Sequence, residues 1–141
     1  MWALDLDFGN NYKFMLLGID WGQRKIGLAI AEEEISIASA LDTIENVDGV
    51  FEVLHNIVKE YDVDKIIIGK SAHLTQDDNV EKIEKFGQKC GEKCNVEIVF
   101  TEEMFSTKEA HENLKKAGKK NIGSIDDAES ARIILQQYLD A

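Results

Sequence analysis

Two nearly continuous apolar runs constrain the fold of this chain most strongly. They are Phe14-Met15-Leu16-Leu17-Gly18-Ile19 and Lys65-Ile66-Ile67-Ile68. Runs without polar alternation are typical of strands that are covered on both faces of a sheet. The chain therefore needs helices on both sides of that sheet.

The order of the other elements predicts the topology. We expect strands at 14–20, 25–32, 35–41, 64–69 and 95–101, and helices at 48–61, 78–92, 106–117 and 126–140. Three consecutive strands followed by alternating helices and strands indicate an antiparallel meander that passes into parallel crossover units. The prediction is an α/β fold with a five-stranded mixed sheet of order 3-2-1-4-5, its first three strands antiparallel, and helices on both faces.

The length of 141 residues fits one compact domain. Residues 1–14 are interpreted as an N-terminal extension and 15–141 as the domain, which we expect to be a monomer or a homodimer. The chain has no run of about 20 apolar residues and no signal-peptide pattern at its start. We therefore expect a cytoplasmic protein without a membrane partner.

Charge and cysteine content limit the possible partners. The formal charge of −11 repels polyanions, so contact with nucleic acid requires a local basic patch or metal ions. Cys90 and Cys94 are too few for a disulfide framework and continue an apolar stripe at helical spacing. We predict that they are core thiols and not a redox or metal pair.

An aspartate stands at the end of the first predicted strand. Asp20 lies in the segment Leu17–Gly27, where glycines follow it closely. In open α/β sheets, ligands bind at the carboxyl ends of the strands. A carboxylate fixed there would be a rigid ligand for a divalent cation, although Asp20 would also suit a turn cap.

Further acidic residues are expected at the same edge of the sheet. Glu103 falls just past the strand at 95–101, and Asp126 and Asp127 begin the last helix. One of these aspartates is expected to cap the helix together with Glu129, while the other binds metal. Three converging carboxylates repel one another unless a cation such as Mg²⁺ or Mn²⁺ neutralises them. Such ions support phosphodiester cleavage without a protein nucleophile.

Three stretches, in order, resemble the YqgF (RuvX) family of Holliday-junction-resolvase-like nucleases. Leu17–Ile30 is similar to the opening strand, turn and second strand of that family. Glu102–Thr107 stands where the family has Asp-Glu-Arg-x-Ser-Thr, and Asp127–Ala131 with Ile134–Leu139 matches its last helix. The resemblance implies a ribonuclease H-like fold. It also implies a hydrolase, a metal-dependent nuclease that processes the precursor of 16S rRNA in ribosome biogenesis.

The resemblance also assigns residue roles. It makes Asp20, Glu103 and Asp127 the catalytic and metal-binding residues, with Mg²⁺ or Mn²⁺ as cofactor. The expected partner is nucleic acid, with RNA preferred over branched DNA. The basic residues expected to bind substrate are Arg24, Lys25, Lys70, Lys115, Lys116, Lys119 and Lys120.

Two departures from the family pattern concern activity more than fold. Met104 replaces an arginine that would clamp a phosphate or form an ion pair, and Lys70-Ser71 replaces a Leu-Pro pair. Lys70 is a candidate to substitute in part for that arginine.

Three alternatives stay open at this point. The chain could be a non-catalytic member of the fold, or a resolvase of branched DNA. It could also be a nucleotide-binding module, because Gly-Ile-Asp-x-Gly also opens the actin-like folds. Those folds use two such lobes, so a single lobe would have to dimerise around the nucleotide.

Overall fold

The computed structural model describes residues 13–71, 77–103 and 126–141, apart from the side chains of 71, 77–79 and 103. The elements are β1 (Met15–Asp20), β2 (Lys25–Glu32), β3 (Ile37–Glu45), α2 (Val50–Glu60), β4 (Val63–Ser71), α3 (Asp77–Cys94), β5 (Glu97–Glu103) and α5 (Asp127–Asp140). No helix in these ranges is long and apolar enough to cross a membrane.

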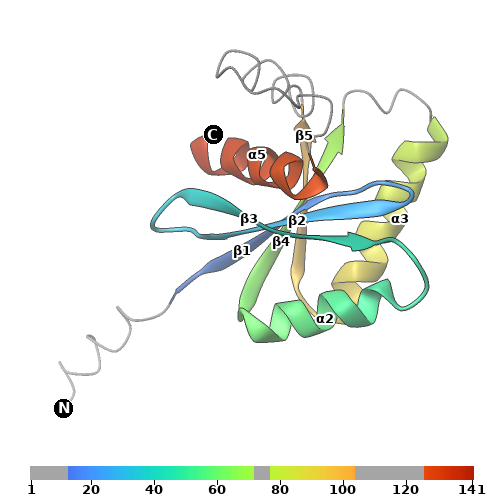
Figure 1. Cartoon of the computed structure of the whole chain (residues 1–141), viewed down its shortest axis with the longest axis horizontal. Coiled ribbons are helices and arrows are strands. Elements are labelled where there is room, and N and C mark those ends of the chain that lie inside the picture. Colours follow the sequence, from blue (N-terminus) through green and yellow to red (C-terminus); the bar gives the residue numbers. More distant parts are fainter. Residues whose placement is uncertain (1–12, 72–76, 104–125) are drawn as a thin grey trace.

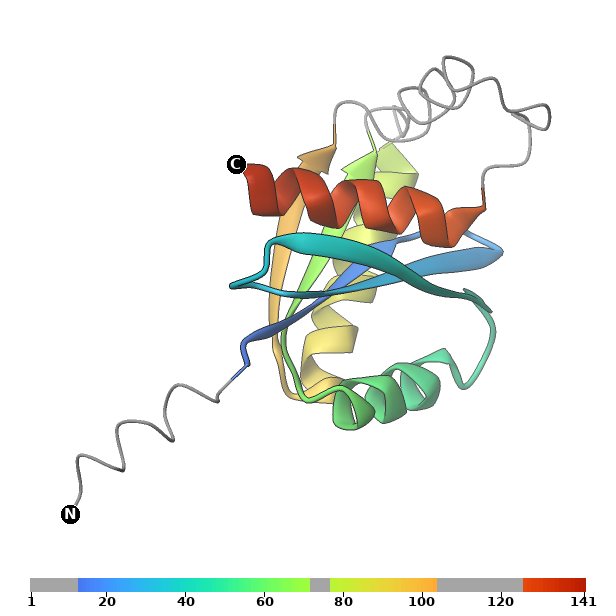
Figure 2. The ribbon, with the colours of Figure 1, turned by 60° about the vertical axis from the view of Figure 1, so that its left-hand side comes forward.

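The strands form one sheet of order β3-β2-β1-β4-β5 (Figure 1). β2 is antiparallel to both β1 and β3, whereas β4 is parallel to both β1 and β5. Helices α2 and α3 cover one face, and α5 crosses the other (Figure 2). The predicted topology is therefore confirmed, and β1 is the central strand.

The two faces of the sheet carry different side chains. The face under α2 and α3 buries large aliphatic residues such as Ile19, Leu54 and Ile68 together with Phe86. The face under α5 buries mostly small residues, and its cluster consists of Leu16, Ala29, Ala31, Ala38, Ile67, Ala131 and Leu135. The predicted cysteine role is also confirmed, since Cys90 and Cys94 are free thiols buried in the first face.

Glycines let α5 approach the sheet closely. A Cβ at Gly18 would lie 2.8 Å from the Cβ of Leu135, and a Cβ at Gly69 would lie 2.7 Å from Ile134 Cδ1. A Cβ at Gly27 would overlap the backbone carbonyl of Asp127. Because these glycines lie on the adjacent strands β1, β4 and β2, three strands together form a shallow bed for the helix.

Two predicted boundaries were wrong for identifiable reasons. Asn95 has φ 55°, and the N–H of Val96 bonds to the carbonyl of Gly91, so α3 runs to Cys94 and closes with a left-handed residue. β5 then starts at Glu97, which makes Glu103 its last residue and not the residue after the strand. β3 runs to Glu45 and not to 41, because it stays paired with β2 past a bulge at Leu28/Ala29 that interrupts the alternation on which the prediction relied.

Several predicted features lie outside the described residues. They are most of the extension at 1–14, the helix at 106–117, Met104, and the lysines Lys115, Lys116, Lys119 and Lys120.

Candidate active site

Asp20 ends the central strand between two glycines. It pairs with Gly27 of β2 on one side and with Gly69 of β4 on the other. Strand alternation places Asp20 on the same face as Gly18, which is the face that α5 covers. Since neither neighbour has a side chain, the start of α5 can lie close to the half-buried carboxyl group of Asp20 at the edge of the sheet.

Asp127 begins α5 directly beside this position. Its backbone carbonyl lies over Gly27, the residue that pairs with Asp20. Burial, followed by the negative charge of Asp127, raises the pKa of Asp20 to about 7. The fold thus holds two carboxyl groups close enough to disfavour the ionised form of one of them.

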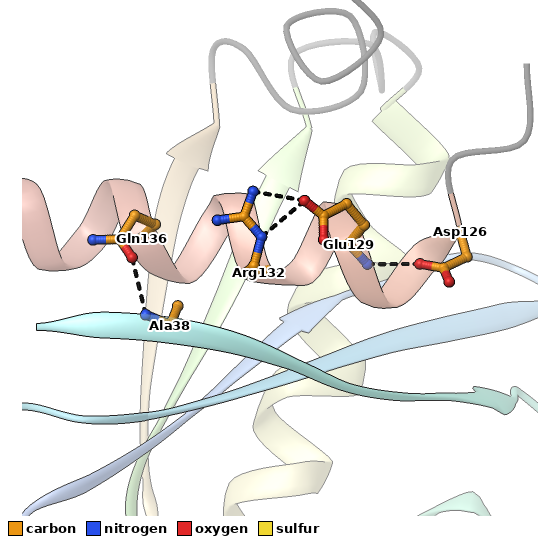
Figure 3. Close-up of polar contacts among 5 residues, drawn as sticks. All are labelled: Ala38, Asp126, Glu129, Arg132 and Gln136. Atoms are coloured by element: carbon orange, nitrogen blue, oxygen red, sulfur yellow. Dashed lines mark hydrogen bonds and ion pairs between the residues drawn. The ribbon is translucent and has the colours of Figure 1, made fainter. Parts of the chain in front are cut away.

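The neighbouring Asp126 has a structural role. Its Oδ1 accepts a hydrogen bond from the backbone N–H of Glu129 at 2.8 Å, which caps α5 (Figure 3). The carboxylate of Glu129 turns away to Arg132, at 2.8 Å from its Nε. Asp126 is therefore the cap of the pair, which leaves the Asp127 side chain available for the site.

Residues at and just after the end of β3 hydrogen-bond to the two segments that carry Asp20 and Asp127. Thr43 Oγ1 accepts a hydrogen bond from the backbone N–H of Ala128 at 3.1 Å, which fixes the first turn of α5. Asn46 Nδ2 donates to the carbonyl of Gly22 at 2.8 Å, and the backbone N–H of Asn46 donates to the carbonyl of Arg24 at 2.8 Å. These contacts fix the turn that follows Asp20.

A second tie holds α5 to β3 farther along the helix. Gln136 Oε1 accepts from the backbone N–H of Ala38 at 2.9 Å (Figure 3). Its Nε2 donates to the carbonyl of Ser36 at 3.0 Å. Because β3 is an edge strand, these bonds also satisfy backbone groups that no other strand pairs. Helix α5 is thus fixed both in position and in rotation.

Glu103 ends β5 at the same edge of the sheet. In the sheet register, Asp20 is level with Gly69, and Gly69 is level with Thr101, so position 103 lies two strands across and two residues beyond. Those steps correspond to about 10 Å across the strands and about 7 Å along them. The backbone places Glu103 at this rim, while its side chain lies outside the described residues.

The described side chains thus bring together two of the three predicted acids. Among them, no three His, Cys, Asp or Glu groups are close enough to hold a metal ion. The carboxyl groups of Asp20 and Asp127 are oxygen donors of the kind that Mg²⁺ and Mn²⁺ prefer. Their mutual repulsion is relieved by a bound cation.

The comparisons with known proteins identify the family of this chain. The sequence matches the family described as "RuvX: Holliday junction resolvase" over residues 14–141, which is nearly the whole chain. The chain belongs to the RuvX family. The resemblance found in the sequence motifs is therefore confirmed, and so is the family's fold.

Relatives of this RuvX-family chain carry a common name. It is 35% identical to the "Putative pre-16S rRNA nuclease" of Rickettsia rickettsii (strain Sheila Smith), over 89% of this chain and 86% of that protein. It is 33% identical to the protein of the same name from Syntrophus aciditrophicus (strain SB), over 89% of this chain and 88% of the other.

Solved structures show the RuvC-like form of the ribonuclease H fold. RuvC of Thermus thermophilus, in complex with a Holliday junction substrate, aligns with a TM-score of 0.60 at 14% identity, covering 89% of this chain and 93% of RuvC. The fowlpox virus Holliday junction resolvase aligns with a TM-score of 0.53 at 10% identity, covering 90% and 99% of the two chains. At such identities the likeness concerns the fold alone.

The predicted substrate-binding residues lie in different surroundings in this RuvX-family protein. Arg24 and Lys25 are exposed at the start of β2. Lys25 shares a cavity of about 620 Å³ with Thr43 and Asp127. Lys70 lies on the opposite face of the sheet, where its Nζ is 3.5 Å from Glu84 Oε2 and 5.0 Å from the centre of the Phe100 ring. Substrate binding by these residues stays a prediction.

Thr43 and Asn46 were not anticipated from the sequence. Their hydrogen bonds reach partners 85 and 24 residues away, and no local spacing signals such contacts. The role of Gly27 was partly visible, because it belongs to the Ile-Gly pattern after Asp20.

Proposed function

We propose that this chain is a divalent-metal-dependent nuclease that hydrolyses phosphodiester bonds in RNA, acting in the 5′-end maturation of 16S rRNA precursors. The observation that carries the proposal is the pair of carboxyl groups of Asp20 and Asp127. They are held at the carboxyl edge of the sheet by contacts that oppose their repulsion. The names of the relatives support the choice of substrate.

Asp20, Asp127 and Glu103 would hold the metal. When bound, Mg²⁺ or Mn²⁺ would supply an activated water and would stabilise the leaving oxygen. The chain's own residues orient these ligands, because Gly27 sets the height of Asp127 above the sheet and Thr43 fixes its helix turn. Lys25 lines a cavity together with Asp127 and would bring a positive charge for a phosphate group beside that metal ligand.

A second candidate substrate is branched DNA. It is favoured by the description of the family as Holliday junction resolvases and by the RuvC-like fold. Acidic metal sites on one fold act on several nucleic acids, so the fold alone does not choose between them.

The test is a cleavage assay with Mn²⁺ on a 5′-extended 16S rRNA precursor fragment and, in parallel, on a four-way DNA junction. We expect the wild type to cut the RNA, and Asp20→Asn, Glu103→Gln and Asp127→Asn each to abolish cleavage. Asp126→Asn is the matched control, because it removes the same charge one residue away and asparagine still caps a helix. It should keep the wild-type rate.

Activity that survives all three acidic substitutions would refute the site. Cleavage of the junction alone would make the chain a resolvase. Nucleotide binding without cleavage of either substrate would favour the nucleotide-binding alternative, and metal binding equal in wild type and Asp20→Asn without cleavage would favour a non-catalytic protein.

A further inference from the structure

Helix α3 carries its lysines on one flank. Its four lysines, which we call the lysine row, are Lys82, Lys85, Lys89 and Lys93. All four are exposed. Their spacings of three and four residues keep them within a band roughly 80° wide, at about 100° per residue.

The glutamates of α3 lie on the flank next to the lysine row and not within it. The same angles place Glu81, Glu84 and Glu92 together on the adjoining flank. Lys85 reaches across to Glu81 at 3.1 Å, but this pair is largely exposed and such pairs contribute little. Within the described ranges, no ion pair engages Lys82, Lys89 or Lys93. A chain of net charge −11 therefore presents a local positive stripe.

The lysine row borders a groove between α2 and α3. A cavity of about 370 Å³ is lined by Phe51, His55, Lys89 and Lys93, together with Gly49 and Glu52. Lys89 Nζ lies 5.1 Å from the centre of the Phe51 ring. Cations beside partly buried aromatic rings are the combination that single-stranded nucleic acid uses, since the backbone binds the cations and bases can stack on rings.

A chain of packed aromatic rings runs from this groove to the residue next to Asp20. Phe51 packs on Phe86 with ring centres 5.3 Å apart, and Phe86 lies 6.4 Å from Trp21, the residue after Asp20. α3 also begins at the edge where β4 ends, which is the edge that carries Asp20. The lysine row thus starts near the site and extends about 16 Å away from it.

We propose that the lysine row binds the phosphodiester backbone of single-stranded RNA that continues beyond the cleaved bond. The proposal rests on the proposed function insofar as it takes nucleic acid as the substrate. It places substrate contacts on the α2–α3 side of the molecule, in addition to the basic residues near Asp127. Because the rest of the chain carries a net negative charge, this local positive stripe attracts a polyanion that the remaining surface repels on average.

The test measures binding of a labelled single-stranded RNA without divalent metal, over a range of salt concentrations. The double variant Lys89→Gln/Lys93→Gln should bind about ten- to thirtyfold more weakly at 0.1 M salt. The slope of log affinity against log salt should fall by about 1.4, or 0.7 for each lost phosphate contact. The matched control is Lys13→Gln/Lys59→Gln, which removes the same charge around a cavity at the starts of β1 and β4, outside the groove that Lys89 and Lys93 line. It should bind like the wild type.

Equal slopes for the lysine-row variant and the wild type would overturn the proposal, and so would an equal loss in the control. A four-way DNA junction serves as a second arm, and a slope change with the junction but not with RNA would also overturn it. Because no metal is present, this result is independent of cleavage. The binding assay can therefore refute RNA binding by the lysine row without refuting the proposed nuclease activity, and the cleavage assay can refute the activity without refuting the binding.

Discussion

On one face of the sheet, α2 and α3 bury large aliphatic and aromatic side chains, whereas on the other face α5 lies against alanines and glycines with only Leu16 and Ile67 as fully buried large sheet residues among those described. Burial of apolar area contributes about 25 cal/mol per Å², so the first face supplies most of the hydrophobic stabilisation. The second face buries less apolar area, but its small residues let α5 lie closer to the sheet. Polar ties from Thr43 and Gln136 then fix the helix in place.

This difference indicates a division of labour within one small domain. The large-residue face holds the sheet together, and the small-residue face sets the position of Asp127 relative to Asp20. Substitutions on the two faces should therefore affect different observables, stability on the first and activity on the second.

The largest effect on stability is expected for Leu54→Ala. Leu54 is fully buried between α2 and the sheet, so its truncation should lower the free energy of unfolding by about 2–5 kcal/mol. Urea unfolding measures this change. The turnover rate per folded molecule, measured at low temperature, should stay the same, and a loss beyond the unfolded fraction would break the proposed division.

Gly27→Ala should lower activity more than it lowers stability. The new methyl group would overlap the Asp127 carbonyl and push the start of α5 away from Asp20. A displacement of about 1 Å lowers activity by roughly 100-fold, with a stability cost of about 1–3 kcal/mol. Steady-state kinetics and unfolding would be measured together.

The control for Gly27→Ala is Gly91→Ala on α3. There the nearest atom to the new Cβ is Cγ1 of Ile98 at 2.9 Å, a side-chain atom of β5 and not the backbone of α5. Alanine also favours a helix by up to about 1 kcal/mol. Near-normal activity in Gly27→Ala would show that the close approach of α5 is not needed.

Asp20→Asn should stabilise the metal-free protein in a pH-dependent manner. The pKa of Asp20 is raised from its ordinary value of 3.8 to about 7, so between these values the folded state binds a proton that the unfolded state has lost. Stability therefore falls as pH rises through this window. Asparagine removes that penalty, with a gain of about 2 kcal/mol at pH 8 after allowing for partial exposure, and almost none at pH 4. Thermal unfolding at both pH values measures the gain, and an equal gain at both would contradict this explanation.

The smallest effect is expected for Thr43→Val, which keeps the shape of the side chain and removes the acceptor for the Ala128 N–H. A loss of about 1 kcal/mol in stability and a five- to tenfold loss in activity should follow. Thr43→Ser, which keeps the hydroxyl group, should restore both. If serine fails to rescue activity, the hydrogen bond does not position Asp127.

The sequence predicted the topology because the strand signals were strong and their order admitted few arrangements. The apolar runs around Leu17 and Ile67 marked the two parallel central strands. The boundaries near Asn95 and Leu41 were missed, because a left-handed residue and a bulge depend on pairing and not on apolar pattern.

The candidate site was predictable in composition but not in its supports. Asp20 and Asp127 follow from strand ends and the family motif, and the capping pattern with Glu129 already suggested that one of Asp126 and Asp127 is a cap. The bed of glycines and the bond from Ala128 to Thr43 depend on how α5 docks, which no local pattern specifies. The spacing of the lysine row was present in the sequence, but the groove beside it was not.

The most direct test of the central claim is calorimetric titration of Mn²⁺ at pH 8 into the wild type, Asp20→Asn, Asp127→Asn and Asp126→Asn. If the paired carboxylates hold the metal, the wild type and Asp126→Asn should bind alike, and the other two should bind at least about tenfold more weakly. Equal affinity in all four proteins would contradict the account.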